Sequence, residues 1–432
     1  MTLAQKIQSK KAKIGIIGLG YVGYPLSIAF AGSGFSVVGL DEDLQKIKKL
    51  NNGKQILKHH EPSKLRDVIK NNSFKATSDF SIIKKLDVII ICVPTPLDKY
   101  RQPDLSAVKE SAKSVAKYLQ PNKLIILEST TYPGTTDEVL SKILSGNGLK
   151  ENKDFFLAYS PEREDPGNKD FSTQTIPKLI GANTPKARKL ANDLYKSVIS
   201  ETFVLNSTKS AEAAKLTENI FRCVNIALVN ELKMIFDSMD VDIWEVIQGA
   251  SSKPFGYMPF YPGPGLGGHC IPIDPFYLAY KAKEFSHSTR FIELAGEINT
   301  AMPNYVIEKI SKALNDENKT INGSKILILG VAYKKDIDDV RESPAIFIFS
   351  QLLKLGSKVK YHDNFVKKLT LEKKVYRSSE LSSDMLSFFD LVLVVTDHSD
   401  LDKDLIKKHS KLIVDCRNAI DPRGFLGKLI KA

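Results

Sequence analysis

A glycine-rich turn between an apolar run and a helical stretch restricts the fold of this chain more than any other feature. Residues 13–17 are mostly apolar, and GLGYVG follows at residues 18–23. Glycines at this spacing allow a tight turn and let a pyrophosphate approach the backbone at a helix N-terminus. A second apolar run, residues 36–40, ends directly before Asp41, where a carboxylate can accept hydrogen bonds from ribose hydroxyls. The pattern predicts a dinucleotide site formed by Gly18, Gly20, Tyr21, Val22, Gly23 and Asp41.

Asp41 also bears on the choice of dinucleotide. Its carboxylate would repel the additional phosphate of NADP, so NAD is the expected cofactor. The alternative is an ordinary tight turn followed by a solvated aspartate.

Short apolar runs alternate with helical stretches in two parts of the chain, the pattern of repeated βαβ units and a parallel sheet. A chain of 432 residues is long enough for two or three domains. Between the two parts, residues 210–249 keep helical apolar spacing with no proline or glycine until the end. We expect an α/β fold with two Rossmann-like doubly wound parallel-sheet domains joined by a long central helix. The expected strands are residues 13–17, 36–40, 88–93, 124–128, 325–330, 358–361, 391–396 and 411–415, with residues 343–355 helical.

Three helix starts can also be predicted. Thr184, Asp274 and Ser343 each precede a proline. Proline suits the first helical position, and the residue before it can cap the helix through its side-chain oxygen.

Composition excludes several classes of protein. The net charge of +12 comes from basic residues spread over the whole chain, so we expect no nucleic-acid partner. The longest apolar runs are too short to span a membrane, and the N-terminus lacks the pattern of a signal peptide, so a cytoplasmic protein is expected. The four cysteines are widely spaced, which argues against structural zinc or a disulfide framework, and no metal site is expected.

Polar side chains follow two of the expected strands. Pro94 and Thr95 come after residues 88–93, and Thr130 and Thr131 come after the run that ends at Glu128. Open α/β sheets bind ligands at the carboxyl ends of their strands. Pro94, Thr95 and Thr130 are therefore predicted to face the cofactor, although Thr130 and Thr131 could simply cap a turn.

A lone thiol and two helix residues are further candidates. Cys270 follows two glycines that let a ligand come close, but most lone cysteines are small core residues. Asp274 nearby can be explained as a helix cap. Lys215 and Asn219 share one helix face, where solvated side chains are the common finding.

Taken together, the motifs identify a family. The chain contains GLGYVG, VPTP, ESTTYPGTT, SPERE, AEAAKLTEN, FYPGPGLGGHCIPIDP and GVAYKKDIDDVRESPA, in this order. They resemble the motifs of the UDP-glucose/GDP-mannose dehydrogenase family, from about residue 13 to residue 420. FYPGPGLGGHCIPIDPFYL and TRFIELAGEINTAMP are most similar to the UDP-N-acetylglucosamine 6-dehydrogenases of bacterial and archaeal surface-polysaccharide pathways.

The resemblance implies three domains and a homo-oligomer. Residues 1–205 would form the NAD-binding Rossmann domain, residues 206–305 a helical domain with the catalytic cysteine, and residues 306–432 a UDP-sugar-binding Rossmann-like domain. A homodimer built through the long central helix, or a higher homo-oligomer, would be expected.

It also implies a reaction and a nucleophile. A primary alcohol at C6 of the sugar becomes a carboxylate while two NAD are reduced. Cys270 would add to the intermediate aldehyde as a thiohemiacetal, a second hydride transfer would give a thioester, and water would release the acid.

Roles for other residues follow from the same resemblance. Lys215 and Asn219 match positions that stabilise oxyanions on the C6 oxygen. Asp274 matches a residue that orients water and poises the thiol, with Thr130 sharing that water, and Glu162 matches a base in thioester hydrolysis. Two or three of these groups could share one proton network.

Residues 260–265 resemble the family loop that lies against the sugar nucleotide, and the resemblance implies further substrate contacts at cationic positions. Lys334 matches a cationic position near the UDP and the cofactor, and Arg341 matches one near the UDP. Both residues could also be solvated surface charges. Arg290 resembles an arginine that reaches the substrate of a neighbouring subunit. His269 stands where UDP-glucose enzymes commonly have serine, which weakens UDP-glucose as the substrate. The full expected set is Glu162, Arg163, Lys215, Asn219, Phe260, Tyr261, Gly263, Gly267, Arg290, Lys334 and Arg341.

Several alternatives stay open. Within the family, the substrate could be UDP-glucose or UDP-N-acetylmannosamine. A hydroxyacid or 6-phosphogluconate-type dehydrogenase also uses a Rossmann domain but needs no cysteine. A nucleotide-sensing protein could keep the fold without catalysis.

Overall fold

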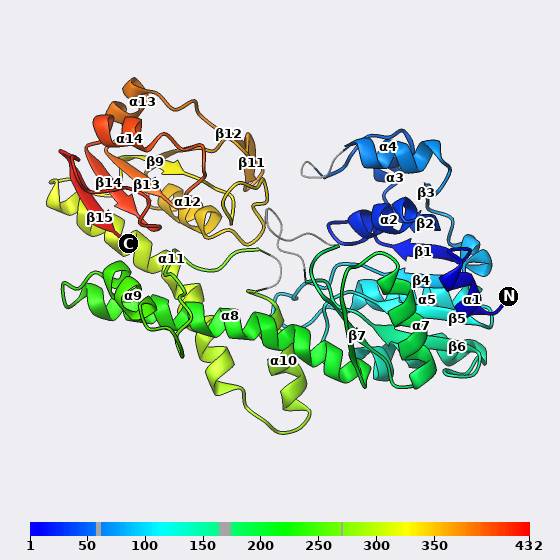
Figure 1. Cartoon of the computed structure of the whole chain (residues 1–432). Coiled ribbons are helices and arrows are strands. Elements are labelled where there is room, and N and C mark those ends of the chain that lie inside the picture. Colours follow the sequence, from blue (N-terminus) through cyan, green and yellow to red (C-terminus); the bar gives the residue numbers. More distant parts are fainter. Residues whose placement is uncertain (58–61, 164–173, 269–270) are drawn as a thin grey trace. The chain divides into compact units, whose positions relative to one another are not determined.

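The computed structural model describes residues 1–57, 62–163, 174–268 and 271–432 (Figure 1). The chain forms two compact units. The first contains Met1–Glu218 and Phe276–His287, and the second contains Asn219–Pro275 and Ser288–Ala432. Both units therefore share the segment 206–305 that was expected to form a middle domain, and the three predicted domain boundaries stay a prediction.

Among the described residues, the first unit contains an eight-stranded sheet in the order β3-β2-β1-β4-β5-β6-β7-β8. Neighbouring strands are parallel except β6 and β7. The order of the first six strands is that of dinucleotide-binding folds, and the strand order reverses between β1 and β4. The strands are β1 (Lys13–Ile17), β2 (Ser36–Leu40), β3 (Phe74–Thr77), β4 (Val88–Ile91), β5 (Lys123–Leu127), β6 (Phe155–Tyr159), β7 (Lys178–Gly181) and β8 (Thr202–Leu205).

Apolar composition explains why these segments form strands. All residues of β4 and β5 are buried. Strand β4 consists of valine and isoleucine, and β5 is mostly leucine and isoleucine, as expected for parallel strands covered on both faces. The predicted cap at Thr184 is confirmed, because its hydroxyl accepts a hydrogen bond from the N–H of Ala187. The helices are α1 (Leu3–Gln8), α2 (Gly23–Gly32), α3 (Leu44–Asn51), α4 (Pro62–Lys70), α5 (Ser106–Tyr118), α6 (Ser141–Leu144) and α7 (Pro185–Lys196), with short helical turns η1 (Phe80–Lys85), η2 (Thr135–Leu140) and η3 (Ser145–Asn147).

The long helix is shorter than predicted. Helix α8 (Thr208–Asp237) begins in the first unit and ends in the second, and α9 (Ile243–Ser251) follows it. The prediction of one helix over residues 210–249 is wrong, because Asp240 takes a left-handed conformation with φ of 54° and interrupts the helix. Asp242 then caps the new helix by accepting a hydrogen bond from the N–H of Trp244. Aspartate suits both positions because its short polar side chain bonds to the local backbone.

The second unit contains a parallel five-stranded sheet in the order β10-β9-β13-β14-β15. This order is that of the other common doubly wound fold, in which the order reverses between β9 and β13. The strands are β9 (Lys325–Leu329), β10 (Lys358–His362), β13 (Leu391–Val394), β14 (Leu412–Asp415) and β15 (Lys428–Lys431), with a hairpin of β11 (Lys368–Leu371) and β12 (Lys374–Arg377). Helix α10 (Asp274–Lys283) begins in the second unit and continues in the first. The further helices of the second unit are α11 (Arg290–Asp316), α12 (Pro344–Lys354), α13 (Ser383–Phe388) and α14 (Lys403–His409).

Two predicted caps differ from expectation. Ser343 precedes α12, but its hydroxyl makes no capping hydrogen bond and is buried without a partner among the described residues. Asp274 is the first residue of α10, and its carboxylate accepts a hydrogen bond from the Asn219 side chain. Within the described part of the chain, no helix has the length and apolarity needed to cross a membrane.

Candidate active site

The turn after β1 has glycine where the backbone requires it. Gly18 has φ of 90°, and a Cβ there would lie 2.5 Å from the carbonyl oxygen of Cys92, beyond β4. A Cβ at Gly23 would lie 2.0 Å from the carbonyl oxygen of Gly18. At Gly20, in contrast, a Cβ would meet no atom within 4 Å. The backbone at Gly20 is therefore open to the close approach that a dinucleotide pyrophosphate needs.

Asp41 lies directly after β2 and is bound to the same turn. Its carboxylate accepts hydrogen bonds from the N–H of Leu19 (2.8 Å) and the Lys46 ammonium (2.7 Å), and from the N–H of Asp43 (3.0 Å). Partial burial acts to raise the pKa of Asp41, but these hydrogen bonds outweigh it and lower the pKa. The group is thus an anion at the place where ribose hydroxyls bind in this fold.

Ser129 joins the ends of β4 and β5. Its hydroxyl accepts a hydrogen bond from the N–H of Val93 (3.0 Å) and donates one to the Val93 carbonyl (2.7 Å). The predicted cofactor residues next to it differ in exposure, since Thr95 is buried, Thr130 is partly buried and Pro94 is exposed. Sequence reasoning missed Ser129, although its place after a buried strand was the available signal.

A buried ion pair lies beside Glu162. Lys178, the first residue of β7, has its ammonium 2.8 Å from Glu128 and 3.8 Å from Glu162. Tyr195 of α7 donates its hydroxyl to Glu128. Burial disfavours the charge on Lys178, but the two carboxylates outweigh it and raise its pKa. A buried ammonium therefore accompanies the carboxylate of Glu162, and nothing in the local sequence predicted it.

Arg163 is bound to protein groups. Its guanidinium lies 2.8 Å from the carboxylate of Glu218 on α8 and donates to the carbonyl of Pro177 (2.6 Å). These contacts fix the side chain that was predicted to bind substrate.

Lys215, Asn219 and Asp274 are all buried, with exposed fractions of 6%, 6% and 1%. Lys215 and Asn219 are therefore not the solvated helix residues that the alternative interpretation expected. The amide of Asn219 donates to the carboxylate of Asp274, which pairs two of the predicted catalytic residues. His269 and Cys270 lie outside the described residues.

Glu212, one turn before Lys215, ties the loop after β5 to α8. Its carboxylate accepts hydrogen bonds from the N–H of Gly134 (2.6 Å) and from the N–H and hydroxyl of Thr136 (2.9 and 2.6 Å). Burial raises the pKa of Glu212 to about 7. The loop that begins with Thr130 is thereby held to the helix that carries Lys215. Sequence reasoning gave Glu212 no role, although a carboxylate between alanines in AEAAK was a visible signal.

The predicted substrate loop, residues 260–265, continues to Gly268 and is held by side chains of the second unit. The Phe260 ring meets Phe221 of α8 edge-on, with centroids 5.6 Å apart. Tyr261 stacks on Trp244 of α9, also at 5.6 Å. Gly263 donates its N–H to the buried side chain of Asn230 (3.0 Å). The aromatic rings therefore anchor the loop as well as forming part of its surface.

The end of this loop meets the other predicted substrate segment. Gly268 donates its N–H to the carbonyl of Arg341 (3.0 Å). A Cβ at Gly267 would lie 2.5 Å from the Cβ of Tyr333, and one at Gly268 would lie 2.8 Å from its ring. The structure thus brings Gly267 together with the loop that carries Lys334 and Arg341.

The three predicted cationic positions differ. Lys334 is partly buried, and Arg341 forms a two-pronged ion pair with Asp339. Arg290 is exposed as the first residue of α11.

Sequence reasoning also missed Arg417. It lies just after β14, and a Cβ at Gly263 would be only 2.5 Å from one of its guanidinium nitrogens. Its Nε donates to the carbonyl of Val395 (2.9 Å). This arginine is placed directly against the predicted substrate loop. Within the described ranges, no group of three His, Cys, Asp or Glu side chains could hold a metal ion.

Comparison with known families agrees with this arrangement. Residues 12–199 match the NAD binding domain of the UDP-glucose/GDP-mannose dehydrogenase family. Residues 209–301 match its central domain, and residues 327–422 match its UDP binding domain. The expected family and the expected cofactor are both confirmed.

Individual relatives cover nearly the whole chain. It is 37% identical to a UDP-N-acetyl-D-glucosamine 6-dehydrogenase of Salmonella typhi, over 90% of both chains. It is 35% identical to a UDP-N-acetyl-D-mannosamine dehydrogenase of Pyrococcus horikoshii, over 96% of this chain and 98% of the relative. A solved structure of UDP-D-ManNAc dehydrogenase from Pyrococcus horikoshii has a TM-score of 0.87 and 34% identity, covering 97% of this chain and 99% of that one. The chain therefore belongs to the UDP-glucose/GDP-mannose dehydrogenase family and is an NAD-binding oxidoreductase of the nucleotide-sugar dehydrogenase type.

Proposed function

We propose that this protein oxidises C6 of UDP-N-acetyl-D-glucosamine to the carboxylate, in two steps at one site, for surface-polysaccharide synthesis. The observation that carries the proposal is the buried hydrogen bond between Asn219 and Asp274. It pairs an amide donor with a carboxylate only four residues beyond Cys270 in the sequence. Oxidation beyond an aldehyde requires a tetrahedral species that can give up a second hydride. A thiol supplies one by adding to the aldehyde, and a donor and a carboxylate can stabilise it and orient water.

The proposed covalent step belongs to Cys270. When bound, NAD accepts the hydride that leaves C6, and the alcohol proton goes to a base, which gives the aldehyde. The Cys270 thiolate adds to the aldehyde carbon, and the resulting alkoxide is the oxyanion of a thiohemiacetal. Loss of a second hydride to a second NAD leaves a thioester. Water cleaves the thioester to the uronic acid and restores the thiol, so four electrons leave each sugar.

The remaining residues take supporting roles in this proposal. Lys215 and Asn219 stabilise negative charge on the C6 oxygen, because fixed donors in a buried site need little rearrangement during reaction. Asp274 and Thr130 orient the water, and Glu162 receives a proton from it. The Lys178 ammonium lies 3.8 Å from the carboxylate of Glu162 and helps to hold this side chain in place.

The preferred sugar is proposed from the substrate loop and the relatives. Phe260 and Tyr261 are anchored rings between prolines and glycines, which suits a shaped wall beside an N-acetyl group. UDP-N-acetylmannosamine is the second candidate, favoured by the names of the two Pyrococcus horikoshii relatives.

A set of UDP-sugars tests the choice. UDP-N-acetylglucosamine, UDP-N-acetylmannosamine and UDP-glucose are each offered with NAD, and kcat/KM is measured from reduced cofactor. UDP-N-acetylglucosamine should exceed UDP-glucose by roughly 10- to 200-fold, the range available from one group in an apolar contact. A higher value for the mannosamine sugar would select the second candidate, and equal or reversed values for UDP-glucose would contradict an N-acetyl preference.

We also propose a homodimer through α8. Phe221, Leu228 and Ile235 are seven residues apart on this helix, with exposed fractions of 47%, 50% and 47%. Residues at this spacing share one helix face, and a repeated apolar face of this kind packs against a second helix. A second copy of the chain presents the same face, as a two-fold interface requires.

A further inference from the structure

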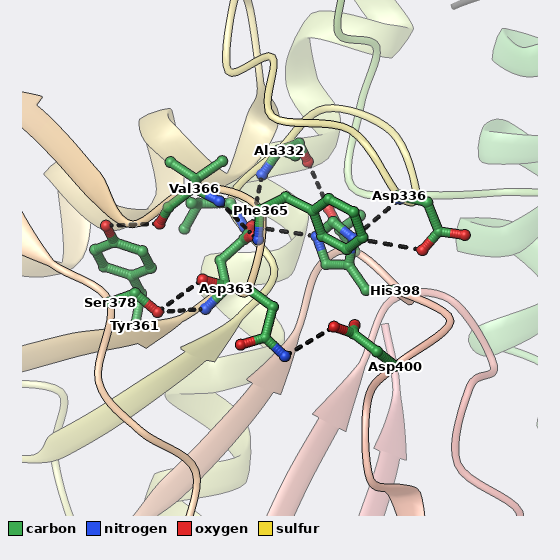
Figure 2. A network of polar contacts seen from close by, with 12 residues as sticks. Ala332, Asp336, Tyr361, Asp363, Phe365, Val366, Ser378, His398 and Asp400 are labelled. Atoms are coloured by element: carbon green, nitrogen blue, oxygen red, sulfur yellow. Dashed lines mark hydrogen bonds and ion pairs between the residues drawn. The ribbon is translucent and has the colours of Figure 1, made fainter. Parts of the chain in front are cut away.

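Asp363 binds backbone groups of two loops at once. It follows β10 directly and is 1% exposed. One carboxylate oxygen accepts the N–H groups of Val331 (2.8 Å) and Ala332 (3.2 Å), in the loop after β9. The other accepts the N–H groups of Phe365 (2.8 Å) and Val366 (2.9 Å), in its own loop. Figure 2 shows the carboxylate at the centre of this network.

His398 adds the loop after β13 and has a defined tautomer. Its Nδ1 lies 3.0 Å from the backbone nitrogen of Asp336 and accepts that N–H. The proton must therefore lie on Nε2, which donates to Asp363 at 3.2 Å. Phe365 stacks on the imidazole, with ring centroids 4.8 Å apart (Figure 2). His398 is thus fixed between two loops by both of its nitrogens.

Neighbours of His398 hold the same loop at further points. The hydroxyl of Thr396 donates to the carbonyl of Ala332 (2.6 Å). The N–H and hydroxyl of Ser399 donate to the carboxylate of Asp336 (2.8 and 2.6 Å). The loop after β13 therefore clamps the loop after β9 at Ala332 and at Asp336.

Electrostatics strengthens the clamp. Burial acts to raise the pKa of Asp363, but hydrogen bonds from His398 and from backbone N–H groups outweigh it and lower the pKa. The carboxylate is therefore charged at neutral pH. Hydrogen bonds to a charged acceptor are roughly twice as strong as neutral ones.

The position of the clamp connects it to ligand binding. It lies beyond the ends of β9 and β13, where the strand order of this sheet reverses, and ligands of such sheets bind at that place. The clamped loop continues to Lys334 and Arg341. Its Tyr333 packs against Gly267 and Gly268, and the Arg341 carbonyl accepts the N–H of Gly268. Gly268 is two residues before Cys270 in the sequence.

We propose that Asp363 and His398 are positioning residues that hold residues 331–341 in the conformation that binds UDP, and thereby fix the backbone at Gly267 and Gly268. The inference rests on the proposed function, because the ligand of the loop is the UDP part of the substrate. Neither side chain needs to touch the reacting atoms for this role.

Two variants and a matched control test the proposal. Asp363→Asn removes the charge and replaces one acceptor oxygen with a donor. His398→Phe keeps a ring for stacking on Phe365 but removes both hydrogen bonds, so it preserves the test if the first variant folds poorly. The control is Asp400→Asn. Exposed Asp400 lies on the loop of His398, and its carboxylate accepts a hydrogen bond from the Asn364 side chain, outside the clamp (Figure 2).

Amide hydrogen exchange without ligand measures the clamp directly. Exchange within residues 331–341 should accelerate roughly tenfold or more in both variants, as expected when a charged hydrogen bond is lost. Residues 13–40 of the first unit and the Asp400→Asn protein should exchange as in the wild type. Unchanged exchange in a folded His398→Phe protein would overturn the inference.

Affinity for UDP alone tests the link to binding. The dissociation constant for UDP should rise roughly tenfold or more in both variants, with NAD affinity unchanged. Unchanged UDP affinity, or an equal loss of NAD affinity, would overturn the positioning role. If the wild type bound no UDP, the proposed function itself would fail, and the exchange result would decide separately whether the clamp exists.

Discussion

The side-chain amide of Asn219 donates a hydrogen bond to the carboxylate of Asp274, and both side chains are buried. The bond joins α8 to the first residue of α10. A buried carboxylate that loses a hydrogen-bond donor no longer has its lost hydration fully replaced. The resulting loss of free energy is larger than for a hydrogen bond at the surface. The pair therefore provides a sensitive test of the proposed catalytic site.

Asn219→Ala should lower kcat about 100- to 1,000-fold, the usual cost of losing one donor that stabilises an oxyanion. KM for NAD should change little. Steady-state kinetics provides the measurement. Asn225→Ala is the matched control, because Asn225 lies on the same helix and its amide donates to the carbonyl of Phe221 in the preceding turn. A loss of activity in the control equal to that in Asn219→Ala would contradict a specific role for Asn219.

Asp41→Asn should reduce the preference for NAD over NADP roughly tenfold, equivalent to about 1.4 kcal/mol. The change removes a negative charge from the ribose site and releases Lys46, which then can pair with the phosphate of NADP. The ratio of kcat/KM for the two cofactors is the measurement.

Two further variants make this result specific. Adding Lys46→Met to Asp41→Asn should remove most of the gained NADP activity. Asp43→Asn takes away the same charge two residues further on but preserves the cap of α3, since asparagine caps as well as aspartate. A similar gain of NADP activity in Asp43→Asn would show that general charge, and not Asp41, sets the preference.

Glu212 should make the stability of the protein depend on pH. Its pKa is about 7 in the folded state against 4.5 for an ordinary glutamate, so the folded state binds more protons between these values. The free energy of unfolding therefore falls as pH rises through this window, by about 1.4 kcal/mol per pH unit. The stabilising contribution of protonated Glu212 to the free energy of unfolding is fully present below pH 4.5 and is lost as pH passes about 7.

Glu212→Gln should remove this part of the pH dependence. Denaturant unfolding at about pH 5 and about pH 8 gives the free energies to compare. Glu110→Gln, at an exposed position paired with Lys113, is the control for losing one negative charge. Parallel pH curves for the wild type and Glu212→Gln would mean that Glu212 does not carry the effect.

Leu228→Glu should weaken the proposed dimer roughly 30-fold or more, because it puts a charge at the centre of the apolar face of α8. Light scattering across a range of protein concentrations measures the change. Leu44→Glu, at an exposed leucine on α3, is the control. A wild-type protein that stays monomeric at high concentration would refute the dimer, whatever the variant does.

Much of the fold could be predicted because it depends on local patterns. Buried parallel strands are continuous apolar runs, so β1, β2, β4, β5, β9, β10, β13 and β14 lie within two residues of the predicted positions. Strand β15 was not predicted. The break of the long helix was missed, because apolar spacing continues through it and the decisive signal is one left-handed residue, Asp240.

Site residues could be predicted where they belong to a local sequence motif. They could not be predicted where the site depends on contacts between residues far apart in the sequence. The glycine turn and Asp41 follow from spacing in one βαβ unit. Lys178 and Glu128 are 50 residues apart, and His398 and Asp363 are 35 apart. Their pairing depends on strand order, which a single sequence does not reveal. Arg417 illustrates the same limit, since its relation to Gly263 exists only in three dimensions.

The most direct test of the proposed reaction is the amount of NADH formed for each UDP-N-acetylglucosamine consumed, with the product identified by mass. We predict two NADH per sugar and a uronic acid for the wild type. Cys270→Ser should still bind the UDP-sugar but lose completion of the second oxidation, because a hydroxyl is a poorer nucleophile than a thiolate. One NADH per sugar with an aldehyde product, or wild-type acid formation by Cys270→Ser, would contradict the proposed four-electron oxidation through Cys270.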